Sequence, residues 1–242
     1  MSWDTQYERV HAHLRNRIVS GALQPGDQVP GERAYAAMLG VSRETVRQGF
    51  RLAEDEGFIV RIPARGTFVA ERRIRQDLGR MQAFDLTVRG VNLAPTYEVV
   101  SVGKVRADAV EAGALGVTPG DPLLAVEAIG MGDRRPLAHY RSMIPTSVAA
   151  RLPFAPDWRT AASYQLIARA LELTAMSVRQ RWEVRPITAD IAAMLQVEDG
   201  APAFRSTSVF TDGTGAPLES RVAWYPGSRY EFTITRTIDL VD

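Results

Sequence analysis

The apolar residues of the first seventy positions follow a helical period and then a strand-like alternation. In the first segment they recur every three or four residues: Tyr7, Val10, Leu14 and Ile18. This spacing predicts one face of an amphipathic helix. The pattern predicts a second, short helix over 32–39 and a third that starts after Ser42, a good N-cap residue, and ends near Gly57. Residues 58–62 and 67–69 then alternate as two strands around a Pro/Gly turn.

Helix, short turn, helix and hairpin is the layout of a winged helix-turn-helix, and the third helix carries suitable chemistry. Arg43, Arg47 and Arg51 are spaced four residues apart, so they line one stripe away from the apolar face. Arginine can hold two acceptors on a guanine edge, or a phosphate. The alternative is a solvated helix face on which these arginines pair with neighbouring acidic residues. Spacing alone does not separate the two interpretations.

Beyond a short charged stretch the pattern becomes mostly strand-like, with helices interspersed. Strands are predicted over 98–102, 123–129, 177–184 and 203–210, and helices over 109–115, 164–173 and 191–195.

An internal repeat runs through this second part of the chain. The turn Val117–Pro122 matches Val197–Pro202, and Pro136-Leu137 matches Pro217-Leu218. One copy by itself is too small to bury a good core. We therefore expect two copies packed together as a mainly antiparallel α+β domain, with a cleft between the halves as the natural ligand pocket.

Composition narrows the possible chemistry. The chain has 242 residues, which favours two domains over one. It has no cysteine and three histidines, so disulfides, thiol catalysis and cysteine-ligated zinc are excluded and a histidine-rich metal site is disfavoured. We expect no catalytic residues and no cofactor. Because we find neither a long apolar run nor a signal peptide, we expect no membrane association and a cytoplasmic location.

The distribution of charge distinguishes the front of the chain from the rest. Residues 1–75 carry 12 arginines and 9 acidic residues, and the whole chain has 29 Lys and Arg against 28 Asp and Glu, so the remainder holds 17 and 19. A basic front fits a nucleic-acid contact confined to that part. We expect a DNA-binding domain over 1–70, a linker over 71–80 and a second domain over 81–242.

Four motifs in the first domain resemble the DNA-binding domain of the GntR superfamily: Leu23–Arg33, Leu39–Arg47, Gly57–Ile59 and Arg65–Val69. The resemblance implies the DNA contacts Arg33, Ser42, Arg43, Thr45, Arg47 and Gly66. The neighbouring wing residues Arg65 and Thr67 complete our candidate set. The chain departs from the family at two positions: the family often has Ser where this chain has Gly31, and usually has Ala where this chain has Gly49. Glycine at position 49 should cost up to about 1 kcal/mol of helix stability.

The second domain resembles the UTRA effector-binding domain of the HutC subfamily, with its chorismate-lyase-like fold. The motifs that carry the resemblance are Leu115–Pro122, Pro136-Leu137, Pro145, Tyr164–Leu166, Val197–Pro202, Gly215–Pro217 and Arg229-Tyr230. The resemblance covers roughly residues 80–238. It implies a homodimer formed through this domain, a small-molecule inducer, and repression from double-stranded operator DNA.

Candidate effector-binding residues are less sharply defined than the DNA contacts. Ser163 and Tyr164 start the central helix, where donors and the helix dipole can hold an anion. Relatives that bind sugar phosphates also carry Arg on the strand that here reads Ala128–Met131, which has no basic residue, so the resemblance does not indicate a phosphosugar. The further candidates are Tyr140, Arg141, Arg181, Glu219, Arg221 and Tyr230. The alternative is that most of these are surface groups or sheet-facing pairs.

Two other function classes are alternatives to an effector-controlled regulator. An enzyme of lyase-like fold tethered to a DNA-binding domain is disfavoured, because the sequence offers no activated nucleophile pair, metal cluster or phosphate loop. A DNA-binding protein that senses no ligand stays open. The sequence does not distinguish a repressor from an activator, nor does it name the effector or the operator.

Overall fold

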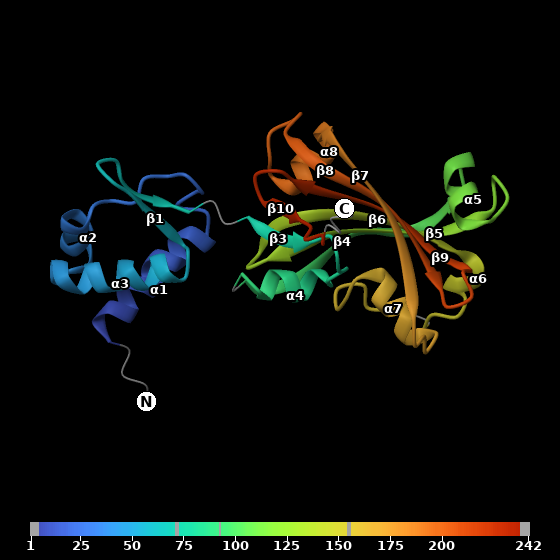
Figure 1. Ribbon diagram of the computed structural model, residues 1–242, viewed down its shortest axis with the longest axis horizontal. Helices are drawn as coiled ribbons and strands as arrows, with labels where there is room; N and C mark the ends of the chain where they lie inside the picture. Colours follow the sequence, from blue (N-terminus) through green and yellow to red (C-terminus); the bar gives the residue numbers. More distant parts are fainter. Residues whose placement is uncertain (1–4, 71–72, 92, 154–155, 238–242) are drawn as a thin grey trace, which may run out of the picture. The chain divides into compact units, whose positions relative to one another are not determined.

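The chain folds into two units, Met1–Arg73 and Ile74–Asp242, and each unit has its own hydrophobic core (Figure 1). The computed structural model describes residues 5–70, 73–91, 93–153 and 156–237. Residues 71 and 72, the start of the segment expected to be a linker, lie outside the described residues.

The first unit has the three helices and the hairpin that the apolar pattern predicts. Its elements are α1 (Gln6–Val19), α2 (Glu32–Leu39), α3 (Arg43–Asp55), β1 (Ile59–Ile62) and β2 (Gly66–Val69). The strands pair antiparallel. The predicted helix residues Val10, Leu14 and Phe50 are buried in the core of this unit.

The start of α3 is set by local chemistry. Gly40 adopts a left-handed conformation, with φ at 65°, which ends α2. Ser42 then caps α3: its Oγ accepts a hydrogen bond from the backbone N–H of Thr45 at 3.0 Å. The first turn of α3 therefore begins at Arg43, and its polar side chains are left toward solvent.

Close packing of α1 on α3 accounts for Gly49. A β-carbon at this position would lie 2.8 Å from the carbonyl oxygen of Tyr7 and 2.7 Å from Cγ1 of Val10. The backbone of α1 leaves no room for it. Glycine therefore lets the two helices approach, at the cost in helix propensity that the sequence suggested.

We expect Gly49→Ala to destabilise the first unit, although alanine favours helix by about 1 kcal/mol. Overpacking of a filled core typically costs about 1–3 kcal/mol, and here one of the contacts is backbone. Urea unfolding followed by circular dichroism measures the change, with Gln48→Ala, exposed on the same helix, as a control that should stay near wild type. A rise in unfolding free energy for Gly49→Ala would contradict this account.

The second unit is built on an antiparallel sheet whose six described strands run in the order β4-β5-β6-β9-β8-β7. These strands are β4 (Pro95–Arg106), β5 (Pro122–Gly132), β6 (Arg135–Pro145), β7 (Met176–Pro186), β8 (Pro202–Asp212) and β9 (Pro217–Pro226). The helices of the unit are α4 (Phe84–Arg89), α5 (Ala109–Leu115), α6 (Thr146–Ala149), α7 (Ser163–Ala170) and α8 (Ala189–Leu195). The mixed α+β architecture agrees with the sequence prediction.

The internal repeat is confirmed by this topology. Each copy runs strand, helix, strand, strand: β4-α5-β5-β6 in the first and β7-α8-β8-β9 in the second. The copies meet at β6 and β9, which pair at the centre of the sheet. Apolar residues of α5 and α8 pack on one face of the sheet, whereas Phe84 and Val88 of α4 pack on the opposite face with Tyr140 and Tyr225 (Figure 1).

A separate short pair of parallel strands forms where the second unit begins. β3 (Ile74–Asp77) pairs with β10 (Tyr230–Thr233), so the segment that follows the first unit is joined to the far end of the described chain. The backbone N–H of Ile74 donates to the carbonyl oxygen of Arg229 at 2.6 Å. These strand residues fall within the stretch that the sequence suggested as a linker.

Arg229, the residue before β10, anchors this strand pair to the rest of the unit. Its buried guanidinium donates to the carbonyl oxygens of Leu195 and Gln196, at the C-terminal end of α8, at 2.6 and 3.0 Å. It also donates to the carbonyl oxygen of Pro136. Burial lowers the pKa of Arg229 to about 10, so the side chain remains charged at neutral pH. Arg229 thus ties β10, and through it β3, to the body of the unit.

Candidate functional site

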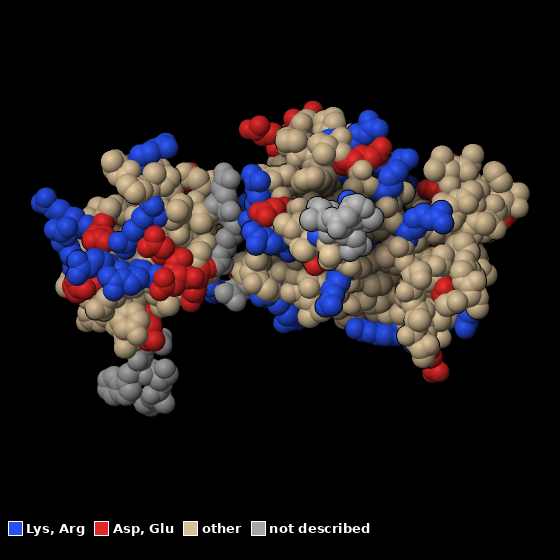
Figure 2. All heavy atoms as spheres, in the orientation of Figure 1, with Lys and Arg blue, Asp and Glu red and all other residues tan. Residues whose placement is uncertain are grey.

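The first unit presents an arginine-rich surface over α2 and α3. Arg33 of α2 and Arg43 and Arg47 of α3 are all exposed. Figure 2 shows basic side chains gathered over the part of this unit that α2 and α3 occupy, with acidic side chains between them. The exposed ends of a recognition helix read base edges in the major groove, so this surface has the composition and geometry of a DNA contact.

Only some of these arginines have an acidic partner. Arg47 pairs with Glu44 one turn earlier, and both side chains are about half exposed, which makes the pair weak and easy to exchange for a phosphate or a base. Within the described part of the chain no acidic side chain pairs with Arg33 or Arg43. Arg47 is thus paired as the alternative interpretation of the stripe expects, whereas Arg33 and Arg43 are left available to contact another molecule.

The hairpin places its tip residues in solvent. Arg65 and Gly66 are exposed and Thr67 is half-buried in β2. Gly66 has φ at 117°, a conformation that side chains rarely adopt, and the Gln28 side chain donates to the carbonyl oxygen of Arg65 at 3.2 Å. The Arg65 guanidinium lies 5.9 Å from the centre of the Phe68 ring. This turn holds Arg65 as an exposed positive charge on an ordered support.

Six aromatic rings wall a cavity in the second unit, between the sheet, α4 and α7: Phe84, Tyr97, Tyr140, Tyr164, Trp182 and Tyr225. Two adjoining hollows share Tyr97, Tyr140, Ala162 and Arg221, and have volumes of about 40 and 20 Å³. Such volumes hold a water molecule or two. A metabolite-sized ligand would require the walls to move apart.

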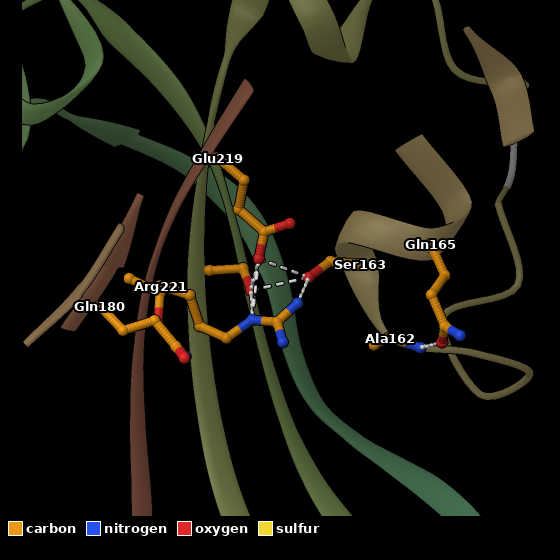
Figure 3. A network of polar contacts seen from close by, with 8 residues as sticks. Ala162, Ser163, Gln165, Gln180, Glu219 and Arg221 are labelled. Carbon is orange, nitrogen blue, oxygen red and sulfur yellow. Dashed lines mark hydrogen bonds and ion pairs between the residues drawn. The ribbon is translucent and has the colours of Figure 1, made fainter. Parts of the chain in front are cut away.

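A buried ion pair lies at the bottom of this cavity (Figure 3). The Arg221 Nε donates to Glu219 Oε1 at 2.9 Å, and its Nη2 donates to Ser163 Oγ at 2.8 Å. Ser142 and Ser163 both donate to the same Glu219 oxygen at 2.7 Å. The whole network is buried, and Glu219 has no exposed surface at all. Neutral and ionic donors converge here on one carboxylate oxygen.

The surroundings of the cavity keep Arg221 charged and the hydroxyls of Tyr97 and Tyr164 protonated. Burial lowers the pKa of Arg221, but the Glu219 carboxylate and the nearby tyrosine hydroxyls together outweigh it and raise that pKa above its ordinary value. The Arg221 guanidinium also lies over the rings of Tyr164, Phe210 and Tyr140, at 4.9, 5.1 and 5.5 Å from their centres. Burial raises the pKa of Tyr97 and Tyr164, so their hydroxyls stay protonated and can donate.

The sequence-predicted effector residues divide into two groups. Tyr140, Ser163, Tyr164 and Arg221 line the cavity, and Glu219 lies directly behind Arg221.

The other three candidates lie elsewhere. Arg141 and Arg181 are exposed on the opposite face of the sheet, because successive side chains of a strand alternate and their neighbours Tyr140 and Trp182 face the cavity. Tyr230 is buried against Tyr225, ring centres 4.9 Å apart, and is not among the lining residues.

Several lining residues were missed by sequence reasoning. Ser142 could have been found, since it is two residues from Tyr140 on the same strand and must share its face. Tyr97 and Trp182 could be identified only from the tertiary structure, which shows that the outer strands β4 and β7 contribute to the cavity wall. The segment 76–82 forms part of the wall, and no periodicity in its charged sequence indicates this.

No group of three His, Asp or Glu in the described part of the chain could hold a metal ion. None of the helices described is long and apolar enough to cross a membrane.

Comparisons with known proteins agree with this arrangement. Residues 6–69 match the family of bacterial regulatory proteins called gntR, and residues 91–231 match the UTRA domain. The transcriptional repressor NagR of Bacillus subtilis is 27% identical over 93% of this chain and 92% of its own length. The histidine utilization repressor of Pseudomonas aeruginosa is 28% identical over 93% and 88%. These relatives are regulators rather than enzymes.

A solved structure extends the likeness to three dimensions. PhnF from Mycobacterium smegmatis superposes with a TM-score of 0.66 and 29% identity, over 95% of this chain and all of that one. The matched regions 6–69 and 91–231 fall within the units Met1–Arg73 and Ile74–Asp242. The chain therefore belongs to the GntR family of bacterial transcriptional regulators, as a member of the HutC type with a winged helix-turn-helix followed by a UTRA domain.

Proposed function

We propose that this protein is a transcriptional repressor that binds operator DNA through its first unit and releases it when a small molecule occupies the aromatic cavity of the second. The observation that carries the proposal is the cavity itself: a buried arginine lies among aromatic rings, and the segment that follows the DNA-binding unit forms a further part of the wall.

The DNA-binding role is assigned to exposed and half-buried residues of α2, of α3 with its cap Ser42, and of the hairpin. Arg43 and Arg47, at the start of α3, would contact base edges, and the remaining residues would hold the phosphates: Arg33, Ser42, Thr45, Arg65, Gly66 and Thr67. An exposed, uncompensated Arg43 supports this assignment.

The effector would bind against Tyr140, Ser163, Tyr164 and Arg221, with Glu219 as the partner of Arg221. Tyr97, whose buried hydroxyl has no hydrogen-bond partner in the described part of the chain, joins them. Arg141, Arg181 and Tyr230 are left out of the proposed pocket, since none of the three lines the cavity.

Segment 76–82 supplies a route from ligand to DNA. Gln76, Asp77 and Leu78 line the cavity and begin only three residues after Arg73. Because the hollows are as small as they are, a ligand must displace part of the wall to enter. Displacing this segment would shift the point at which the DNA-binding unit is attached, and a ligand that favours the shifted state lowers operator affinity by that difference.

Membership of the GntR family also leads us to propose a homodimer in the cytoplasm, where bacterial DNA lies. Two recognition helices related by a two-fold axis would read a symmetric operator, with half-sites spaced to match the protein.

Arg65 allows a test of the wing's separate contribution. We expect Arg65→Ala to weaken binding to all duplexes about equally and to lower the slope of log affinity against log salt by about 1 per protomer, or about 2 for the dimer, because the exposed charge acts on phosphates rather than on bases. Fluorescence anisotropy at four salt concentrations, with operator and scrambled duplexes, measures both effects. A selective loss of operator binding would instead assign Arg65 to base recognition.

The proposed function is tested by titrating the purified protein with DNA from upstream of its own coding region. Tight binding that a scrambled duplex does not reproduce, and that a metabolite reverses, supports the proposal. If selection from random DNA also returns no motif, the proposal fails.

A further inference from the structure

The solvent side of α5 is apolar, whereas the outer side of a surface helix normally carries charged residues. Val110 and Gly113 are exposed, and Ala114 is half-buried. Val110 is 78% exposed, the largest fraction among the large apolar side chains that the structure describes. The one charged residue within α5, Glu111, accepts from the backbone N–H of Asp108 at 3.1 Å. Figure 2 shows few charged side chains at the end of the second unit where α5 lies.

A groove of about 390 Å³ lies beside this apolar side of α5. The helix contributes Gly113 and Ala114 to one wall, and the strands contribute apolar atoms of Val178, Val209 and Pro217. A β-carbon at Gly113 would meet no atom within 4 Å, so this wall leaves free space. The groove is much larger than either hollow of the aromatic cavity. It can therefore admit an apolar side chain without rearrangement.

The two sides of the groove carry opposite charges. Arg179 of β7 is the one charged residue among those that line it, and no acidic side chain in the described part of the chain pairs with this arginine. Asp108 and Glu111 lie on the other side, at the start of α5. A second α5 placed in the groove would bring its own two carboxylates toward Arg179. Such pairing of opposite charges fixes the orientation of two surfaces.

A protruding side chain and a groove that fits it adjoin on one surface, so this surface is complementary to itself. In a dimer with two-fold symmetry the same patch serves both copies, and Val110 of each copy can enter the groove of the other. A polyanion such as DNA finds no such match, because the single Arg179 faces it together with two carboxylates. The second copy is thus the occupant that the shape and the charges favour.

We infer that α5 and the adjoining groove form the contact between two copies of this chain, with Val110 of each copy packed in the groove of the other. The inference rests on the proposed function, because it names the surface of the homodimer proposed there. α5 and α4 pack on opposite faces of the sheet, so this contact is separate from the aromatic cavity beside α4.

Sedimentation velocity of the full-length protein over a concentration series measures the dimer dissociation constant. Val110→Asp places a carboxylate in the apolar groove, and Gly113→Arg fills the groove from a position where its own protomer leaves space. We expect each variant to raise the dissociation constant at least about a hundredfold, because an interface core strongly disfavours an unpaired charge. Leu86→Asp, 61% exposed on α4, is the matched control and should dimerise as wild type does.

A wild-type protein that stays monomeric throughout the series would overturn the inference, and so would folded variants that dimerise as tightly as wild type. Loss of the dimer in Leu86→Asp alone would also overturn it, since the contact would then lie elsewhere. Circular dichroism reports the folding of each variant. Should Val110→Asp not fold, Gly113→Arg decides, because arginine favours a helix more than glycine does.

Operator binding by the same samples separates this inference from the proposed function. Wild type that dimerises through α5 but binds no operator contradicts the proposed function and supports the inference. Wild type that binds the operator, together with a Val110→Asp protein that remains a dimer, contradicts the inference alone.

Discussion

Arg43→Ala is expected to weaken binding to the operator by about 1–3 kcal/mol, or about 5- to 150-fold. Arg43 is the first residue of α3, its side chain is exposed, and no acidic side chain in the described part of the chain neutralises it. At this position a guanidinium reaches a guanine edge and donates to two acceptors at once. Anisotropy titrations against the operator and against single-base variants measure the loss.

Matched variants on the same helix sharpen this prediction. Arg47→Ala should also weaken binding to the operator, but by less than Arg43→Ala, because Arg47 must first break its ion pair with Glu44 to contact DNA. Arg51→Ala, two turns further along α3, is the control for a general loss of positive charge. Unchanged operator affinity in both Arg43→Ala and Arg47→Ala would remove α3 as the recognition helix.

Arg221→Met is expected to destabilise the second unit by about 3–5 kcal/mol, because it leaves the Glu219 carboxylate buried without its charge partner. Two serine hydroxyls would remain on Oε1, while Oε2 already lacks a hydrogen bond within the described part of the chain. Urea unfolding followed by tryptophan fluorescence reports the change, since Trp158, Trp182 and Trp224 all belong to this unit.

The double variant Glu219→Gln/Arg221→Met separates charge from packing. Removing both charges of a buried pair is often close to neutral, whereas removing one is costly. We therefore expect the double variant to regain most of the stability lost in Arg221→Met. If Arg221→Met costs less than about 1 kcal/mol, or the double variant is no more stable than the single one, the Glu219 carboxylate does not depend on the Arg221 charge and this account of the buried pair is wrong.

Local patterns in the sequence were sufficient for the elements of the first unit and for β4, β5, β7, β8, α5, α7 and α8 of the second, but they did not indicate β3, α4, α6 or β10. The apolar spacing of α1 to α3, the cap at Ser42 and the turn at Val117–Pro122 are short-range signals, because each depends on residues within one or two turns of chain. The repeat also predicted that two similar halves would pack as one mainly antiparallel α+β domain, and the structure joins them in one sheet.

Packing decided what those signals leave open. From the sequence, Gly49 was expected only to lower helix stability. The close approach of α1 explains why glycine is needed at this position.

The cavity required the tertiary structure for a different reason. Its walls come from strands and helices far apart in the sequence, and a side chain's face depends on strand register, so Tyr140 lies inside whereas Arg141 lies outside. The pairing of β3 with β10 joins the two ends of the second unit, which no local period can indicate. The sequence by itself thus determined a DNA-binding regulator with an effector domain, and the three-dimensional packing decided which residues form the pocket and which segment leads from it to the DNA-binding unit.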